Sequence, residues 1–178
     1  MMDYFELIRR RESCRAYREK PVEKEKLLRC IEAARLAPSA CNGQPWSFVV
    51  VNDPEMSPKL AKCTQEMGLN KFTDQVSAFV VVLEEKTTLL PQLSGVVKDQ
   101  RYSSIDLGLA VGQLCLAATA QGLGSCIMGM FQEQKIKTLL GIPKEKRIRL
   151  VVSVGYPAKE EPREKKRKAM EEILRYIG

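Results

Sequence analysis

The chain has 178 residues, of which 44% are hydrophobic and 29% are charged, a balance typical of a globular protein rather than a disordered one. It contains no histidine, which excludes Ser-His-Asp triads, Cys-His nucleophiles, histidine zinc ligands and a histidine proton relay. The net charge is +7, but residues 9–20 and residues 163–168 each sum to +4, so the remainder sums to −1. This distribution predicts two local anion-binding patches and disfavours a broad nucleic-acid-binding face.

Hydrophobic periodicity and turn residues predict helices and strands that alternate irregularly in one α/β layer system, and we expect residues 1–178 to form one domain. Asp3 and Glu6 have the spacing of a capping box, which opens a helix that ends near Arg10. Further helices are expected over residues 22–37, 58–67, 104–121, 134–140 and 167–177. Strands are expected over residues 47–51, 78–83, 125–130 and 150–156. Residues 87–100 lack clear periodicity, which predicts a loop or lid.

Residues 107–132 carry no charge and are long enough to span a bilayer. Several polar residues and the breaks at Gly122 and Gly124 instead favour a buried helix, a tight turn and a buried strand, so we expect no membrane partner. The six cysteines form no CxxC pair and no secretion signal is evident, which predicts reduced thiols in a cytoplasmic protein. We expect Cys41 to be a small buried thiol and Met130 to belong to the core.

The segment 9–15 (RRRESCR) has the chemistry of an anion site. Arg11 and Arg15 offer charged donors, and Ser13 places a small hydroxyl between them, a set suited to phosphate. The alternative is a solvated basic helix end that complements the helix dipole.

The segment 38–46 (PSACNGQPW) lies between a predicted helix and a predicted buried strand. Asn42 and Gln44 each offer a donor and an acceptor, which suits the amide-like edge of a heterocycle. The alternative is a helix stop with side-chain turn bonds followed by a core residue, Trp46.

Taken in order, these two segments resemble the FMN-dependent nitroreductase family, whose pattern continues along nearly the whole chain. The later matching pieces are residues 106–108 (DLG), 122–126 (GLGSC), 154–157 (VGYP) and 165–168 (KKRK). The resemblance implies an α+β fold with a central, mostly antiparallel sheet flanked by helices. It also implies an intertwined homodimer with two FMN sites at the interface, each drawing residues from both subunits.

The resemblance also assigns roles to residues. The first phosphate and flavin contacts match Arg11, Ser13 and Arg15, and the C-terminal phosphate-binding pair matches Lys165 and Arg167. The two +4 segments are therefore expected to meet at one phosphate, across or beside the dimer interface. The stretch of the partner subunit that covers the flavin matches Pro38, Ser39, Ala40 and Asn42.

Two further groups are expected near the flavin ring. The strand end whose backbone N–H approaches flavin N5 matches Gly129 and Met130, and the residues that read the pyrimidine edge match Asn70 or Lys71. Two positions depart from the family pattern. Ala40 stands where a second serine is common, and Glu12 adds a negative charge inside the phosphate motif.

The implied activity is that of an oxidoreductase in which the bound FMN performs the hydride transfer and the protein binds and orients the reactants. NADH or NADPH would deliver hydride to flavin N5, and an electron-poor small molecule, nitroaromatic or quinone-like, would then accept it from the same pocket in a ping-pong cycle. The alternatives are a non-catalytic FMN-binding or storage protein, a reductive dehalogenase or flavin-fragmenting enzyme of the same fold, and a basic nucleic-acid binder. The charge distribution disfavours the last of these, so no nucleic acid partner is expected.

Overall fold

The computed structural model describes residues 3–86 and 100–178. The predicted loop or lid over residues 87–100 therefore lies almost wholly outside the described residues. The helices are α1 (Tyr4–Arg10), α2 (Lys24–Arg35), α3 (Met56–Thr64), α5 (Tyr102–Ala120), α6 (Glu133–Leu140) and α7 (Met170–Ile173), and the strands are β1 (Trp46–Val51), β2 (Ala78–Glu84), β3 (Gly124–Met128) and β4 (Arg147–Gly155). The short 3-10 helices are η1 (Ala40–Asn42), η2 (Glu66–Gly68) and η3 (Lys71–Gln75).

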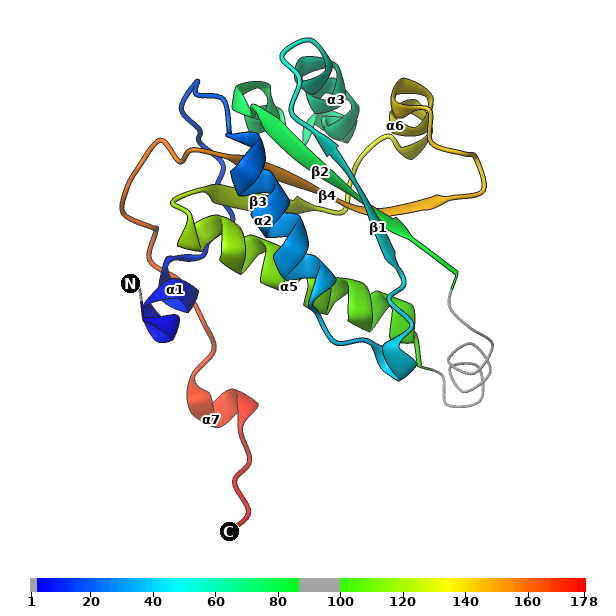
Figure 1. Ribbon diagram of the computed structural model, residues 1–178. Coiled ribbons are helices and arrows are strands. Elements are labelled where there is room, and N and C mark those ends of the chain that lie inside the picture. Colours follow the sequence, from blue (N-terminus) through cyan, green and yellow to red (C-terminus); the bar gives the residue numbers. More distant parts are fainter. Residues whose placement is uncertain (1–2, 87–99) are drawn as a thin grey trace.

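The four strands form one antiparallel sheet in the order β1-β2-β4-β3. Helices α2 and α5 lie on one face of the sheet, and α3 and α6 lie on the other (Figure 1). Strand β2 is central, and its run of apolar residues is buried on both faces, as expected of a strand covered on two sides. The α+β fold with a flanked antiparallel sheet is thus confirmed.

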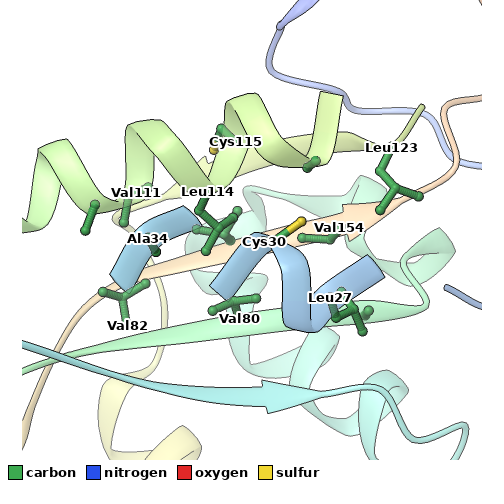
Figure 2. Packing of buried hydrophobic residues seen from close by; sticks show 14 of the residues in the cluster. Leu27, Cys30, Ala34, Val80, Val82, Val111, Leu114, Cys115, Leu123 and Val154 are labelled. Carbon is green, nitrogen blue, oxygen red and sulfur yellow. The ribbon is translucent and has the colours of Figure 1, made fainter. Parts of the chain in front are cut away.

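The core on the α2–α5 side of the sheet joins both helices to β2 and β4. Figure 2 shows Leu27, Cys30 and Ala34 of α2 facing Val80 and Val82 of β2 and the buried residues of α5. Helix α5 passes the length and hydropathy test for a membrane span, as the uncharged stretch suggested. Seven of its nineteen residues are buried, and six of these belong to this core. The prediction of a buried helix, a turn and a buried strand is confirmed.

Two helix predictions were wrong in part. The side chain of Asp3 caps α1 by accepting from the Phe5 amide, but Glu6 pairs with Arg9 and Arg10 instead of closing a capping box. The predicted helix over residues 167–177 shrinks to the four residues of α7. Its apolar side chains are exposed (Met170, Ile173, Leu174, Tyr176 and Ile177), so packing within the chain does not stabilise a longer helix.

Candidate functional site

Residues 13–18 lie along the ends of β3 and β4. The Cys14 amide donates to the Ser125 carbonyl at 2.9 Å, and the Arg18 amide donates to the Tyr156 carbonyl at 2.9 Å. Ser13 forms a parallel bridge with Ser125 at the start of β3. The sheet therefore fixes the backbone of the predicted phosphate motif, and the motif is not a free helix end.

Two glycines allow this close approach. A Cβ on Gly124 would lie 2.8 Å from both Cβ and Sγ of Cys14, and a Cβ on Gly155 would lie 2.8 Å from the Tyr17 ring. Only a residue without a side chain lets the segment approach so closely. Both glycines belong to the motifs that first indicated the family.

Tyr17 anchors the same segment from inside the core. Its hydroxyl donates to the Cys14 carbonyl at 3.0 Å and lies 3.0 Å from the Ser153 hydroxyl. Burial is the main cause that raises the pKa of Tyr17 well above its ordinary value, so the phenol stays protonated as a hydrogen-bond donor.

The C-terminal basic segment returns to the N-terminal one within the same chain. The Lys165 ammonium donates to the Ile8 carbonyl at 2.7 Å and also to the Arg9 carbonyl. The Arg163 guanidinium donates to the Ser13 carbonyl at 2.8 Å. The expectation that the two +4 segments meet is therefore confirmed in their placement.

Several positively charged side chains of this region lie close together and repel one another. Desolvation, followed by the nearby cations Arg11 and Arg167, holds the pKa of Lys165 below its ordinary value. We call Arg11, Lys165 and Arg167 the cation cluster. Such a grouping costs free energy in isolation and is favourable when a polyvalent anion binds it.

Arg11 and Arg15 lie near enough to two buried thiols, Cys115 of α5 and Cys126 of β3, for their charges to act on them. Burial raises the pKa of Cys115, and the Ser125 side chain, followed by the charge of Arg11, opposes that shift. Burial likewise raises the pKa of Cys126, and Arg15 supplies the largest opposing effect. The side chain of Ser125 is buried beside these thiols. The predicted residues Arg11, Ser13 and Arg15 thus lie close together.

A second group of predicted residues meets at the other end of β3. The Asn70 side-chain amide donates to the Met130 carbonyl at 3.2 Å and to the Thr64 carbonyl at 3.0 Å. Gly129 and Lys71 are exposed beside these two residues in the chain. Met130 is 47% exposed, so the expectation that it belongs to the core was wrong. From Ser125 to Met130, an extended backbone covers about 17 Å at 3.3 Å per residue.

The third group of predicted residues lies in a loop near the start of α5. This loop contains Pro38, Ser39, Ala40 and Asn42. The Ala40 amide donates to the buried carboxylate of Asp106 at 3.2 Å, near the start of α5. The Ser39 hydroxyl accepts from the Gln44 amide at 3.0 Å. Cys41 has φ 51° and is exposed, so the expectation of a buried thiol was wrong.

These groups do not all meet within one chain. The loop lies at the start of α5, whereas the phosphate motif lies beside the turn that follows the end of α5 (Figure 1). The distance from Asp106 to Ala120 along the helix axis is about 21 Å at 1.5 Å per residue. One chain therefore presents two partial sites at opposite ends of its longest helix.

Sequence reasoning missed several residues that build the site. Asp106, Tyr17 and Arg163 position the predicted residues. All three lie in segments whose charge or motif pattern stands out in the sequence, but nothing in those patterns indicates this supporting role. A cavity of about 340 Å³ was also not foreseen. It is lined by residues that alternate with the predicted ones, among them Arg10, Cys14 and Arg18, and by the C-terminal end of α5.

The fold defines an α+β protein, and the cation cluster is a candidate site for an anionic group. The chain belongs to the nitroreductase family, whose sequence model, described as "Nitroreductase family", matches residues 8–156. This confirms the resemblance that the motifs indicated.

Similar proteins carry oxidoreductase names. A protein of Archaeoglobus fulgidus, provisionally named NADH dehydrogenase/NAD(P)H nitroreductase, is 35% identical over 90% of this chain and 88% of its own length. Iodotyrosine deiodinase 1 of Mus musculus is 28% identical over 97% of this chain and 68% of its own length. A provisionally named nitroreductase of Exiguobacterium sibiricum, solved in complex with FMN, matches with a TM-score of 0.81 at 23% identity, covering 99% of this chain and 98% of that one.

Proposed function

We propose that the chain binds FMN and passes hydride from NADH or NADPH to a small electron-poor acceptor, in a homodimer with an FMN site at each end of the interface. The observation that carries this proposal is the cation cluster at one end of β3 together with the Asn70–Met130 pair at the other end. The oxidoreductase names of the relatives support the same class of reaction. We place the protein in the cytoplasm, in keeping with its six free cysteines.

The phosphate end is built for a dianion. Arg11, Lys165 and Arg167 bring three positive charges together, and Ser13 and Arg15 lie on the same fixed segment. A phosphate would accept several charge-assisted hydrogen bonds there and relieve the repulsion from Arg11 and Arg167, which lowers the pKa of Lys165 in addition to desolvation. The residues therefore fit the phosphate of FMN.

The ring end offers donors and acceptors in complementary positions. Asn70 donates through its side-chain nitrogen to two backbone carbonyls, which orients its Oδ1 as an acceptor for a ring N–H. Gly129 and Met130 follow directly after β3, which lies at the edge of the sheet, and under this proposal their backbone N–H groups would donate to the ring. When bound, FMN supplies the hydride chemistry, and the chain supplies binding and orientation. Without histidine, protons would come from water.

A second copy of the chain completes the site. Helix α5 separates the two partial sites, so a subunit related by a two-fold axis can place its residues 38–42 over the flavin held by this chain. The exposed apolar side chains of α1, α5 and the C-terminal tail give such a dimer surfaces to bury, as in Tyr4, Phe5, Ile105, Leu109 and Tyr176. The loop already has its conformation fixed by Asp106, which lowers the entropic cost of assembly.

Flavin absorbance tests the proposal. The purified protein should carry about one FMN per chain, and NADH or NADPH should bleach it under anaerobic conditions, after which a panel of nitroaromatics and quinones should restore the colour. Protein that rejects added FMN would refute the proposal. Bound FMN that neither nicotinamide reduces would favour storage or another electron donor. Initial-rate patterns that intersect rather than run parallel would exclude the ping-pong order.

Reductive dehalogenation is the second candidate function. It is favoured by the match to iodotyrosine deiodinase 1, which extends over 97% of this chain. The same FMN site would serve, with a halogenated phenol as the acceptor in place of a nitroaromatic. Incubation of the dithionite-reduced protein with iodotyrosine and measurement of released iodide distinguishes the two candidates. Stoichiometric iodide release would support the second, and reoxidation by nitroaromatics alone would support the first.

A further inference from the structure

Glu12 is an acidic residue inside an otherwise cationic segment, and the structure shows what it contacts. Its Oε2 accepts from the Arg163 backbone amide at 3.3 Å and from the Arg163 Nε at 3.0 Å. The Arg163 guanidinium also donates to the Ser13 carbonyl, the next residue along the chain. Three hydrogen bonds thus join one residue of the C-terminal segment to two consecutive residues of the phosphate motif.

These bonds decide where the following residues lie. Two positions beyond Arg163, the Lys165 ammonium binds the Ile8 and Arg9 carbonyls at the end of α1. Residues 163–165 are therefore attached at two points. The charges of Arg11 and Arg167 both act on Lys165, so both guanidinium groups lie near its ammonium. Pro157 and Pro162 precede this stretch, and it forms no helix or strand, so regular secondary structure does not hold it in place.

We propose that Glu12 and Arg163 form a latch that positions Lys165 and Arg167 beside Arg11 for the phosphate of FMN. The proposal rests on the proposed function, because FMN is its ligand. It explains a departure from the family pattern: the acid inside the phosphate motif is bonded to the second basic segment. Glu12 is a positioning residue under this proposal and does not touch the phosphate.

The latch can be distinguished from a simpler electrostatic effect because the two predict opposite changes in phosphate binding when Glu12 is substituted. Glu12 lies close enough to Lys165 for its charge to raise the pKa of that ammonium, so it weakens the positive potential of the site. If Glu12 acted only through space, its removal would strengthen phosphate binding. If it acts as the latch, its removal frees the C-terminal segment and weakens phosphate binding.

The test compares two ligands and matched variants. FMN and riboflavin, which lacks the phosphate, are titrated into FMN-free protein, and binding is followed by the quenching of flavin fluorescence. Glu12→Gln and Arg163→Gln are each expected to weaken FMN binding about threefold to tenfold, the range for a partly exposed, charge-assisted pair. Riboflavin binding should change less than twofold, since the latch orders only the phosphate end. The double variant should cost little more than either single one, because the two side chains act as one unit.

Glu164→Gln is the matched control for charge. Glu164 is exposed, lies between Arg163 and Lys165, and makes no hydrogen bond or ion pair among the described residues. Glu164→Gln removes one negative charge, as Glu12→Gln does. FMN binding by Glu164→Gln should therefore stay equal or become slightly tighter. Thermal unfolding of each FMN-free variant reports on folding separately from binding.

Each outcome decides the proposal. Weaker binding of FMN but not riboflavin in both single variants, with non-additivity in the double variant, supports the latch. Equal or tighter FMN binding by Glu12→Gln overturns it in favour of the through-space effect. An equal loss for both flavins, or additive losses, also overturns it. Wild-type protein that binds FMN no more tightly than riboflavin would instead refute the phosphate site itself, and the latch with it.

Discussion

The contact between Gly124 and Cys14 makes a sharp prediction about how the phosphate motif is held. In Gly124→Ala the new Cβ would lie 2.8 Å from Cys14 Cβ, well inside van der Waals contact. Rotation of the Cys14 side chain can move Sγ away, but Cβ is fixed by the backbone, which is bonded to Ser125. The segment must therefore shift. Overpacking of this kind costs about 1–3 kcal/mol of unfolding free energy.

Urea unfolding measures this cost, and the fluorescence of the single, buried Trp46 reports it. Because the contact is with Cys14, the double variant Gly124→Ala/Cys14→Gly removes the clash, and a double-mutant cycle should show about 1–2 kcal/mol of favourable coupling. FMN affinity should fall in the single variant and recover in part in the double. An unchanged midpoint for Gly124→Ala, or a cycle without coupling, would refute the claim that close approach requires this glycine.

Three further predictions concern charge and exposure. Arg11→Ala and Arg167→Ala should each lower FMN affinity by about 1.5–3 kcal/mol, from a lost charge-assisted hydrogen bond, and unchanged titrations for both would mean that the phosphate site is misplaced. Cys41 should be the thiol that reacts first with a maleimide in FMN-free protein, with FMN slowing the reaction, and peptide mapping by mass spectrometry would expose any other order. The hydrogen bond from Lys146 is the main cause that holds the pKa of Glu85 below its usual 4.5, so this pair stabilises the fold above that pH, and the contribution disappears as the pH falls through the lowered pKa. Acid titrations of Glu85→Gln should show a flatter loss of stability there, and parallel curves would contradict the assignment.

Much of the fold follows from short-range patterns in the sequence. The apolar runs of β1 and β2 and the periodic helix α2 lie within a few residues of their predicted bounds, because burial on one or two faces leaves a clear signature. The prediction of a helix over residues 167–177 was wrong in length because its apolar face is not buried. The spacing of its apolar residues is that of an amphipathic helix, but these residues are exposed and pack against no other described part of the chain.

The candidate site was predictable in its chemistry and less so in its construction. Charge runs and motif order predict Arg11, Ser13, Lys165 and Arg167 as phosphate contacts, since phosphate recognition needs those residue types, and the structure brings the two segments that carry them together. The partners that hold them depend on contacts across more than a hundred residues, such as Arg163 with Glu12, and no local pattern encodes such a contact. Strain is equally invisible: the left-handed backbone of Cys41 is set by the loop around it.

The length of α5 has a thermodynamic consequence for the proposed dimer. The phosphate motif and the loop at residues 38–42 lie at opposite ends of this helix, which spans about 21 Å from Asp106 to Ala120, so under the proposed function one subunit does not bring both to the same flavin. Binding of FMN and association of the subunits are then linked equilibria. The free energy by which FMN stabilises the dimer equals the free energy by which dimerisation strengthens FMN binding. Dilution should release the flavin with a concentration dependence, and saturating FMN should lower the concentration at which subunits separate.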